Sequence, residues 1–304
     1  MKPLYKSMLM VTVILMGATC PTSSSPKEGS DALELAIPNG PYFGQVTPGS
    51  TPQPFAPGIV STKRWDYGGT YTHDMSEFYF LRENKETKKQ EFVVFKNKNN
   101  RWYETVISRR VGQPFVAPGD QTIHLGRRYI ERSDTGLSEV KSLGAPFDKY
   151  LIMRLSASAQ GTYVFDQIIR NNDGGYNDAP IHVSRLIDGK RETPKQMNNE
   201  INAGKWNSHP FIAPDESYLL WDSEREGGFG GNDIYVSFRQ KNGSWGKAIN
   251  LGDKINTPGW DAAASVTPDG KYILFHRSVD PDGDDNVDIY WVEAAILETL
   301  RDQE

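Results

Sequence analysis

Short runs of aromatic and β-branched residues, separated by clusters of Pro, Asp, Asn and Gly, recur along most of this chain. Examples are Tyr-Leu-Leu-Trp at 218–221, Ile-Tyr-Val at 234–236 and Tyr-Ile-Leu-Phe at 272–275. Runs of this length and composition are typical of β-strands. No interior stretch keeps apolar residues at the 3.6-residue period of a helix for three turns. The pattern therefore predicts an all-β protein.

One strand-and-turn phrase is repeated along the chain. Residues 209–221 read His-Pro-Phe-Ile-Ala-Pro-Asp-Glu-Ser-Tyr-Leu-Leu-Trp, and Asp-Ile-Tyr-Val-Ser follows at 233–237. The phrase restarts at 267–275, and more divergent copies begin near residues 72, 113 and 158. Five copies fill residues 55–293 at roughly 50 residues each, a normal length for a four-stranded propeller blade. They predict a single five-bladed β-propeller of four-stranded antiparallel blades.

The last copy lacks a fourth strand. After Val292 the chain continues into residues 293–301, where Ile296, Leu297 and Leu300 share one side of a short amphipathic C-terminal helix. We expect residues 54–61 to supply the missing strand, because a closed ring leaves no open sheet edge. The propeller is therefore assigned to residues 41–304.

The turns and third strands resemble a known repeat. The Pro-Asp turns at 214–215 and 268–269, Gly-Gly-Asn-Asp-Ile-Tyr-Val-Ser at 230–237 and Ile-Asn-Thr-Pro at 255–258 are similar to the Pro-Asp-type, WD-like repeats of TolB-related propellers. The match is strongest over residues 205–292, and two copies carry His73-Asp74 and Ala159-Gln160 in place of the Pro-Asp pair. The resemblance implies an extracytoplasmic binding or scaffolding propeller and no single conserved reaction.

The N-terminus has the anatomy of a bacterial lipoprotein signal. Lys2 and Lys6 precede an apolar run at 8–18 that is too short to span a bilayer comfortably, and Thr19 and Cys20 follow it directly. We therefore expect a signal peptide at 1–20, acylation of Cys20, a flexible tether at 21–40, and a lipid-anchored protein in the periplasm or at the cell surface. Gly17 and Thr19 depart from the usual lipoprotein pattern, so a secreted soluble protein or an uncleaved anchor is the alternative.

Composition narrows the classes of partner. Lys plus Arg number 34 against 39 for Asp plus Glu, and no basic run marks a nucleic-acid surface. We expect no nucleic-acid partner, and membrane contact only through the lipid anchor. The single Cys excludes an intramolecular disulfide in this chain.

Catalytic motifs are absent from the sequence. The chain contains no Gly-x-Ser-x-Gly elbow, no His-Glu-x-x-His and no phosphate-binding P-loop. The five histidines fall on different strands and turns of the repeat, so we do not expect them to converge on one metal ion.

Propeller geometry nonetheless indicates a binding site. First strands line the central channel, and the five copies place Gly68, Gln113, Arg154, His209 and Ala263 at equivalent positions near one rim. Unlike residues at equivalent sites suit an asymmetric ligand, with aromatic platforms and directional polar groups. The predicted ligand-binding residues are Trp65, Asp66, Gln113, Arg154, Trp206, His209, Trp260 and Asp261. Alternatively, the tryptophans fill gaps between blades and the aspartates satisfy loop amides.

An acidic loop is a weak candidate for a calcium site. Asp280, Asp282 and Asp284 have the alternate spacing of oxygen-ligand calcium loops, although Gly283 is misplaced relative to an EF-hand. The alternative is a solvated acidic hairpin loop. No other cofactor is expected.

Two function classes remain. The first is a non-catalytic binding or scaffolding module for a carbohydrate or protein partner. The second is a carbohydrate-active enzyme, a glycoside hydrolase or polysaccharide lyase, that uses Asp66 and Asp261 with Arg154 and His209 nearby. Hydrolysis would need two carboxyl groups roughly 5–10 Å apart across a cleft.

Overall fold

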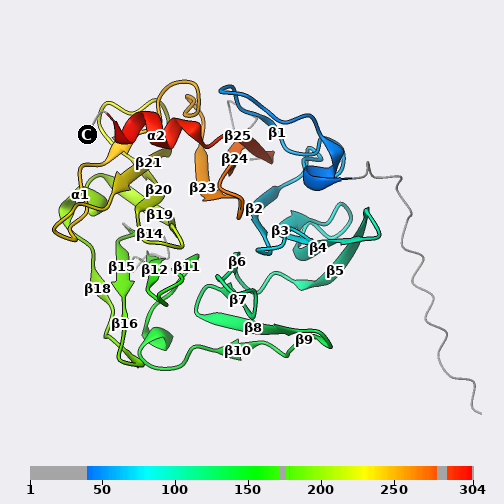
Figure 1. Cartoon of the computed structure of the whole chain (residues 1–304), viewed down its shortest axis with the longest axis horizontal. Helices are drawn as coiled ribbons and strands as arrows, with labels where there is room; N and C mark the ends of the chain where they lie inside the picture. Colours follow the sequence, from blue (N-terminus) through cyan, green and yellow to red (C-terminus); the bar gives the residue numbers. More distant parts are fainter. Residues whose placement is uncertain (1–39, 171–175, 178, 279–285, 303–304) are drawn as a thin grey trace, which may run out of the picture. The chain divides into compact units, whose positions relative to one another are not determined.

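The computed structural model describes residues 40–170, 176–177, 179–278 and 286–302, all within the compact unit Glu34–Glu304. Their strands form five four-stranded antiparallel blades in a propeller ring (Figure 1). The predicted all-β, five-bladed architecture is confirmed. No helix in the described part of the chain is both long and apolar enough to cross a membrane.

The blades follow one another in chain order. Blade 1 contains β2 (Asp66–Tyr71), β3 (Glu77–Glu83), β4 (Gln90–Lys98) and β5 (Arg101–Arg109). Blade 2 contains β6 (Pro114–Val116), β7 (Thr122–Leu125), β8 (Arg128–Ser133) and β10 (Lys141–Ser142), with β9 (Gly136–Leu137) on the far end of β8. Blade 3 contains β11 (Leu155–Ala157), β12 (Tyr163–Asp166), β15 (Ile181–Ser184) and β18 (Lys195–Gln196). Blade 4 contains β19 (Lys205–Ile212), β20 (Tyr218–Glu224), β21 (Asp233–Phe238) and β22 (Ile249–Asn250).

Blade 5 contains β23 (Asp261–Val266), β24 (Tyr272–Ser278), β25 (Val287–Glu293) and the N-terminal strand β1 (Gln53–Pro54). Small hairpins are β13 (Ile169–Arg170) with β14 (Tyr176–Asn177), and β16 (Leu186–Ile187) with β17 (Lys190–Arg191). The helical elements are η1 (Pro41–Gly44), η2 (Phe147–Lys149), α1 (Asn199–Asn202) and the C-terminal α2 (Ala295–Arg301). α2 confirms the short C-terminal helix, and α1 is a single turn.

The N-terminal strand closes the ring, as predicted, but at a different position. Gln53 pairs with Trp291 and Pro54 with Tyr290, and the Phe55 N–H adds a hydrogen bond to the Ile289 carbonyl. The chain then turns instead of continuing as a strand to residue 61. Ala56 has a φ of 43°, a left-handed conformation that an extended strand excludes, so the predicted strand at 54–61 was wrong in its extent.

An aromatic segment ahead of β1 fills the space where blades 1 and 5 meet. The Phe43 side chain is 1% exposed, and its ring stacks on Trp102 with centroids 4.4 Å apart. The Tyr42 hydroxyl donates a 2.5 Å hydrogen bond to Asp269 in the first turn of blade 5. The segment therefore joins the first and last blades through side chains as well as through the backbone of β1.

A β-bulge in the first strand is shared by blades 1, 4 and 5. Strand register shifts between Tyr67 and Thr70 in blade 1, and at the matching places of β19 and β23. Gly68, His209 and Ala263 each occupy the bulge with a φ between 50° and 69°. These residues were predicted to be equivalent, and the common bulge gives their alignment a structural basis.

Candidate ligand-binding site

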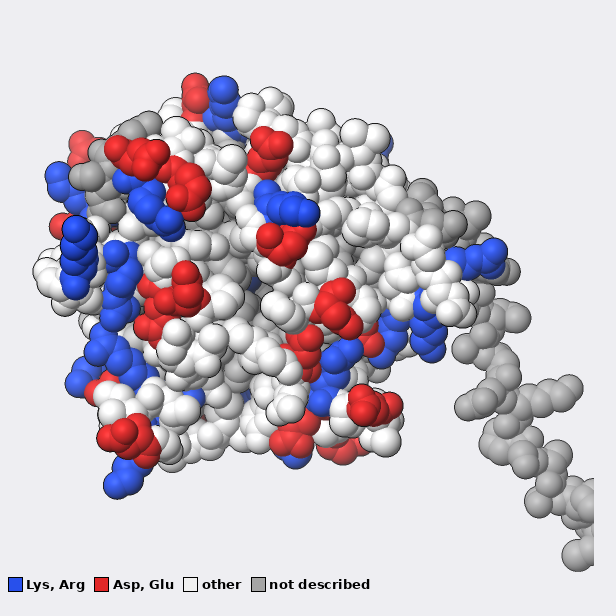
Figure 2. Space-filling view, in the orientation of Figure 1, with Lys and Arg blue, Asp and Glu red and all other residues white. Residues whose placement is uncertain are grey.

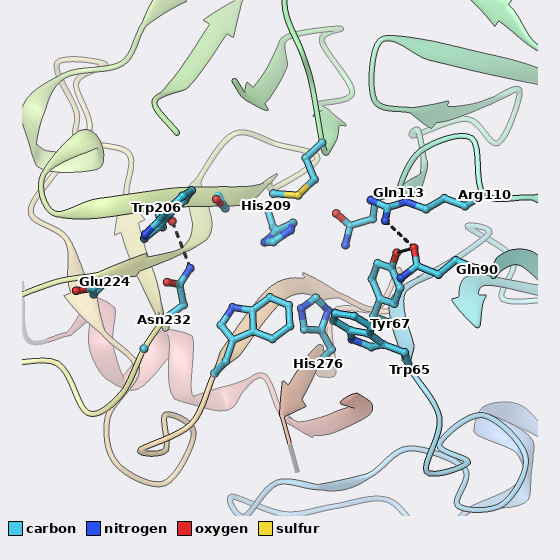
Figure 3. A pocket seen from close by; sticks show the side chains of 14 residues that line it. Trp65, Tyr67, Gln90, Arg110, Gln113, Trp206, His209, Glu224, Asn232 and His276 are labelled. Atoms are coloured by element: carbon cyan, nitrogen blue, oxygen red, sulfur yellow. Dashed lines mark hydrogen bonds between the residues drawn. The ribbon is translucent and has the colours of Figure 1, made fainter. Parts of the chain in front are cut away.

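A pocket of about 520 Å³ opens at the end of the channel where the chain enters the first strands (Figure 3). Small-molecule sites have volumes of about 300–1,000 Å³, so the pocket has a suitable size. Residues from all five blades contribute to it. They are Trp65, Tyr67, Gln90, Arg110, Gln113, Met153, Trp206, Ser208, His209, Glu224, Gly231, Asn232, Trp260 and His276.

Three tryptophans from equivalent positions surround the pocket. Trp65 and Trp260 directly precede β2 and β23, and Trp206 lies at the start of β19. Trp206 is the most accessible, with 37% of its surface exposed, whereas Trp65 and Trp260 are half-buried. The indole of Trp260 packs against His276 at a centroid distance of 4.7 Å. The ring of tryptophans offers flat apolar surfaces beside polar side chains.

His209 is held in a fixed orientation by a buried carboxylate. Its Nδ1 lies 2.9 Å from Oδ1 of Asp222, which is fully buried. Asp222 also accepts hydrogen bonds from the Ala263 N–H at 2.9 Å and from Asn232 Nδ2 at 2.8 Å. Because Asp222 engages Nδ1, Nε2 is the ring nitrogen that is left for a ligand in the pocket.

Gln113 and His276 form the floor of the pocket. Each is 1% exposed, and both side-chain polar atoms of each residue have no hydrogen-bond partner within the described residues. Burial lowers the pKa of the His276 imidazole well below its usual range, with smaller contributions from His209 and Arg154. A neutral imidazole carries one donor and one acceptor. In Figure 3, Gln113, His209 and His276 point toward the same space.

Arg154 crosses the channel instead of lining the pocket. It is fully buried, and its Nη1 reaches from blade 3 to the Ala264 carbonyl of blade 5 at 3.2 Å. Burial lowers the pKa of Arg154 to about 10, and the negative charges of Asp222 and Asp166 oppose that effect. Nε and Nη2 have no partner in the part of the chain that the structure describes.

Asp166 accepts backbone hydrogen bonds that connect blades 3 and 4. Its carboxylate receives the N–H groups of Met153, Arg154 and His209 at 2.9–3.0 Å. The carboxylate is fully buried, and burial raises its pKa above the usual value. Asp166 and Asp222 are therefore both committed to positioning the backbone around the channel.

The predicted rim carboxylates form ion pairs inside blades 1 and 5. Asp66 and Asp261 are fully buried and lie 2.7 and 2.6 Å from the Nε atoms of Arg82 and Arg277. Burial raises the pKa of Asp261, and the charge of Arg277 opposes this. Each aspartate also accepts the backbone N–H and hydroxyl of the threonine four residues earlier. The same arrangement in two blades indicates a structural role for both carboxylates.

Charges at the mouth of the pocket are mixed. Arg110 donates to Gln90 Oε1 at 2.6 Å, and the Tyr67 hydroxyl donates to the same atom. Glu224 contributes an acidic group on the other side of the mouth. On the face drawn in Figure 2, basic and acidic side chains are interspersed.

The structure brings together five of the eight predicted ligand-binding residues: Trp65, Gln113, Trp206, His209 and Trp260. Arg154, Asp66 and Asp261 are buried and are not among the described residues that line the pocket. Asp280, Asp282 and Asp284, like Cys20, lie outside the described residues. Within the described residues, no group of three or more His, Cys, Asp or Glu could hold a metal ion.

Sequence reasoning missed His276 and Asp222. His276 was treated as an isolated strand histidine, but its ring lies 5.7 Å from that of His209. In the structure, Asp166, Asp222 and His276 occupy equivalent positions, because each pairs with an isoleucine of the third strand in its blade, Ile181, Ile234 or Ile289. Alignment of the turns alone sets Asp166 beside Trp221 and Phe275 and hides this equivalence, whereas the third-strand motif Ile-x-Val-Ser, at 181–184 and 234–237, reveals it for blades 3 and 4.

Comparisons with known proteins give only distant similarities. No family model matches the sequence, and a search of curated proteins found no relative. Similar solved structures include TolB from Acinetobacter baumannii, with 12% identity, a TM-score of 0.46, and coverage of 76% of this chain and 57% of that one. An α-L-arabinofuranosidase from Lactobacillus brevis has 14% identity, a TM-score of 0.49, and coverage of 77% and 91%. A thermostable family-43 glycoside hydrolase has 15% identity, a TM-score of 0.46, and coverage of 76% and 90%. At these identities the likeness concerns the fold alone.

Proposed function

We propose that this protein is a lipid-anchored, extracytoplasmic propeller that binds a carbohydrate in the channel-mouth pocket without transforming it. The observation that supports this proposal is the set of three equivalent tryptophans around a pocket with a polar floor. A sugar ring presents apolar C–H faces and hydroxyl edges, and indole rings beside directional polar groups complement both.

A protein partner is the alternative kind of ligand for this scaffold. Stable protein interfaces bury about 1,200–2,000 Å² and are centred on extended contact surfaces. The three tryptophans and the polar side chains beside them lie in a concave pocket of about 520 Å³. This concentration favours a small or narrow ligand, such as a saccharide, over a broad protein surface.

The proposed binding is tested with the full chain, purified in a detergent without a sugar headgroup, on an array of immobilised oligosaccharides. Trp206→Ala should weaken binding to any captured oligosaccharide about tenfold, or ~1.4 kcal/mol, as expected for loss of an aromatic anchor. Trp245→Ala is the matched control, because Trp245 lies outside the pocket. Absence of wild-type binding to every saccharide would refute the proposal.

Anchoring through Cys20 is a separate part of the proposal. It is supported by the apolar run that lies directly before Thr19 and Cys20 and by the polar segment that follows them. Cys20→Ser should move the protein from the membrane fraction to the soluble fraction. If the wild type and Cys20→Ser appear in the same fraction with the same apparent mass, Cys20 does not anchor the protein.

A carbohydrate-active enzyme remains the second candidate, and the His209–Asp222 pair favours it. A histidine whose Nδ1 is held by a buried carboxylate has the arrangement of a general base with its orienting group. If the protein is an enzyme, His209→Asn should abolish release of reducing ends or unsaturated products even at oligosaccharide concentrations that saturate its binding. Failure of the wild type to change any bound oligosaccharide would remove this candidate.

A further inference from the structure

Resting on the proposed carbohydrate function, we propose that the pocket takes the terminal residue of a neutral saccharide end-on, and that Gln113 and His276 bind its hydroxyl groups. His276 was not expected to take part in a binding site, and the inference assigns it a role in specificity.

The first argument is the chemistry of the floor. Gln113 offers an amide donor and a carbonyl acceptor, and none of its side-chain polar atoms has a partner in the described chain. The two ring nitrogens of His276 are likewise unpartnered there. Buried polar groups without partners are costly, so a ligand that satisfies them gains affinity. Sugar hydroxyl groups both donate and accept hydrogen bonds, so they can pair with the amide of Gln113 and with both ring nitrogens of His276.

A carboxylate fits the same floor poorly. An ionised carboxylate only accepts hydrogen bonds, so the Gln113 carbonyl and the acceptor nitrogen of His276 would remain unsatisfied. Arg110 is the one Lys or Arg among the described lining residues, and it lies at the mouth, where it donates to Gln90 and where Glu224 supplies an opposing charge. Arg154 is a single buried cation beside the two buried carboxylates Asp166 and Asp222, and it is not among the described residues that line the pocket. The site therefore favours an uncharged sugar over an acidic one.

The second argument concerns how a ligand reaches the floor. Gln113 and His276 are almost completely buried, whereas Trp206 at the mouth is 37% exposed. A saccharide lying across the mouth would contact the tryptophans without reaching the floor. Arg154 spans the channel from blade 3 to blade 5, so the passage does not continue freely to the opposite face. The geometry points to entry of a chain end.

The test compares matched probes on the full chain. Neutral oligosaccharides immobilised through one end are set beside uronic-acid oligosaccharides of the same length, and linear probes beside cyclic ones that have no terminal residue. We expect binding to the linear neutral probes, and at least tenfold weaker binding to the acidic and cyclic ones.

Two variants test the floor directly. Gln113→Leu and His276→Phe should each weaken binding of the best neutral probe about 3- to 10-fold, the effect of losing one or two hydrogen bonds. Both should leave the melting temperature within a few degrees of the wild type, because each replaces polar atoms that have no partner. The matched control is His124→Phe, since His124 is equally buried on β7 and its Nδ1 also lacks a partner within the described residues. Because His124 is not among the residues that line the pocket, the His124→Phe variant should bind the neutral probe with the affinity of the wild type.

The outcomes separate this inference from the proposed function. If Trp206→Ala weakens binding while Gln113→Leu and His276→Phe do not, carbohydrate binding stands and end-on recognition at the floor is wrong. Equal affinity for acidic or cyclic probes would likewise overturn the inference alone. If the wild type binds no saccharide, both proposals fail. Selective loss in the two floor variants, with His124→Phe unaffected, would support the inference.

Discussion

Removing the Phe43 ring should open the junction between the first and last blades. The ring is 1% exposed and lies among four aromatic rings of the closure region. It stacks on Trp102 at 4.4 Å and meets Phe95, Phe55 and Phe78 edge-on at centroid distances of 5.1, 5.7 and 6.0 Å. Phe43→Ala therefore leaves a cavity at the place where the ring is closed.

The size of the effect follows from this burial. Replacing a buried Phe with Ala costs about 3–5 kcal/mol through lost transfer free energy and the cavity left behind. For a domain of this size, each kcal/mol lowers the melting temperature by roughly 2–4 °C, so we expect a decrease of roughly 6–20 °C. The lower end applies if the surrounding side chains collapse into the cavity.

Thermal unfolding followed by circular dichroism measures this decrease. Phe229→Ala is the matched control, because Phe229 is 45% exposed and should change the melting temperature by less than about 2 °C. A double-mutant cycle with Trp102→Ala should show coupling of at least about 0.5 kcal/mol, as expected for residues in contact. A shift for Phe43→Ala no larger than that of Phe229→Ala would refute the role of this segment in closure.

Three further predictions concern the charged groups of the ring. Burial acts to raise the pKa of Asp269, but hydrogen bonds from Tyr42 and Thr267 lower it overall, so its stabilising contribution is present above about pH 4 and is lost as the pH falls below that value. Tyr42→Phe should therefore reduce the loss of stability between pH 5 and pH 3 in urea titrations, and an unchanged pH dependence would contradict this. Asp261→Asn should lower the free energy of unfolding by about 3–5 kcal/mol, because it removes the carboxylate that pairs with the largely buried Arg277. Asp66→Asn should cost less, because Arg82 keeps its ion pair with Glu104 at 3.0 Å. If these variants instead lose ligand binding and keep the melting temperature of the wild type, both carboxylates act in binding and not in stability. Arg154→Met should cost about as much as Asp261→Asn, since it removes the cation beside two buried carboxylates, and a melting temperature within a few degrees of the wild type would show that this charge is not structural.

The blade architecture could be predicted from the sequence because strand pairing inside a blade is local. Each hairpin joins neighbouring segments, so alternating apolar residues, Pro-Asp turns and a repeat of roughly 50 residues were sufficient. The equivalence of Gly68, His209 and Ala263 could be inferred for the same reason, and their common bulge confirms it. The extent of the closing strand could not be predicted, because alanine is rarely left-handed and nothing in the sequence marks the turn at Ala56 that follows β1.

The content of the channel was decided only by the tertiary structure. There, side chains far apart in sequence meet, as Arg154 meets the Ala264 carbonyl 110 residues away. Alignment of the repeats brought Gln113 and His209 to the same end of the channel, but it did not show that Asp66 would be neutralised inside its own blade by Arg82. It also did not show that the ring nitrogens of His276 would find no partner among the described residues, in a pocket that three tryptophans line. Local hydrogen bonding and apolar periodicity determine a blade, whereas the partners of a buried polar group depend on how all five blades converge.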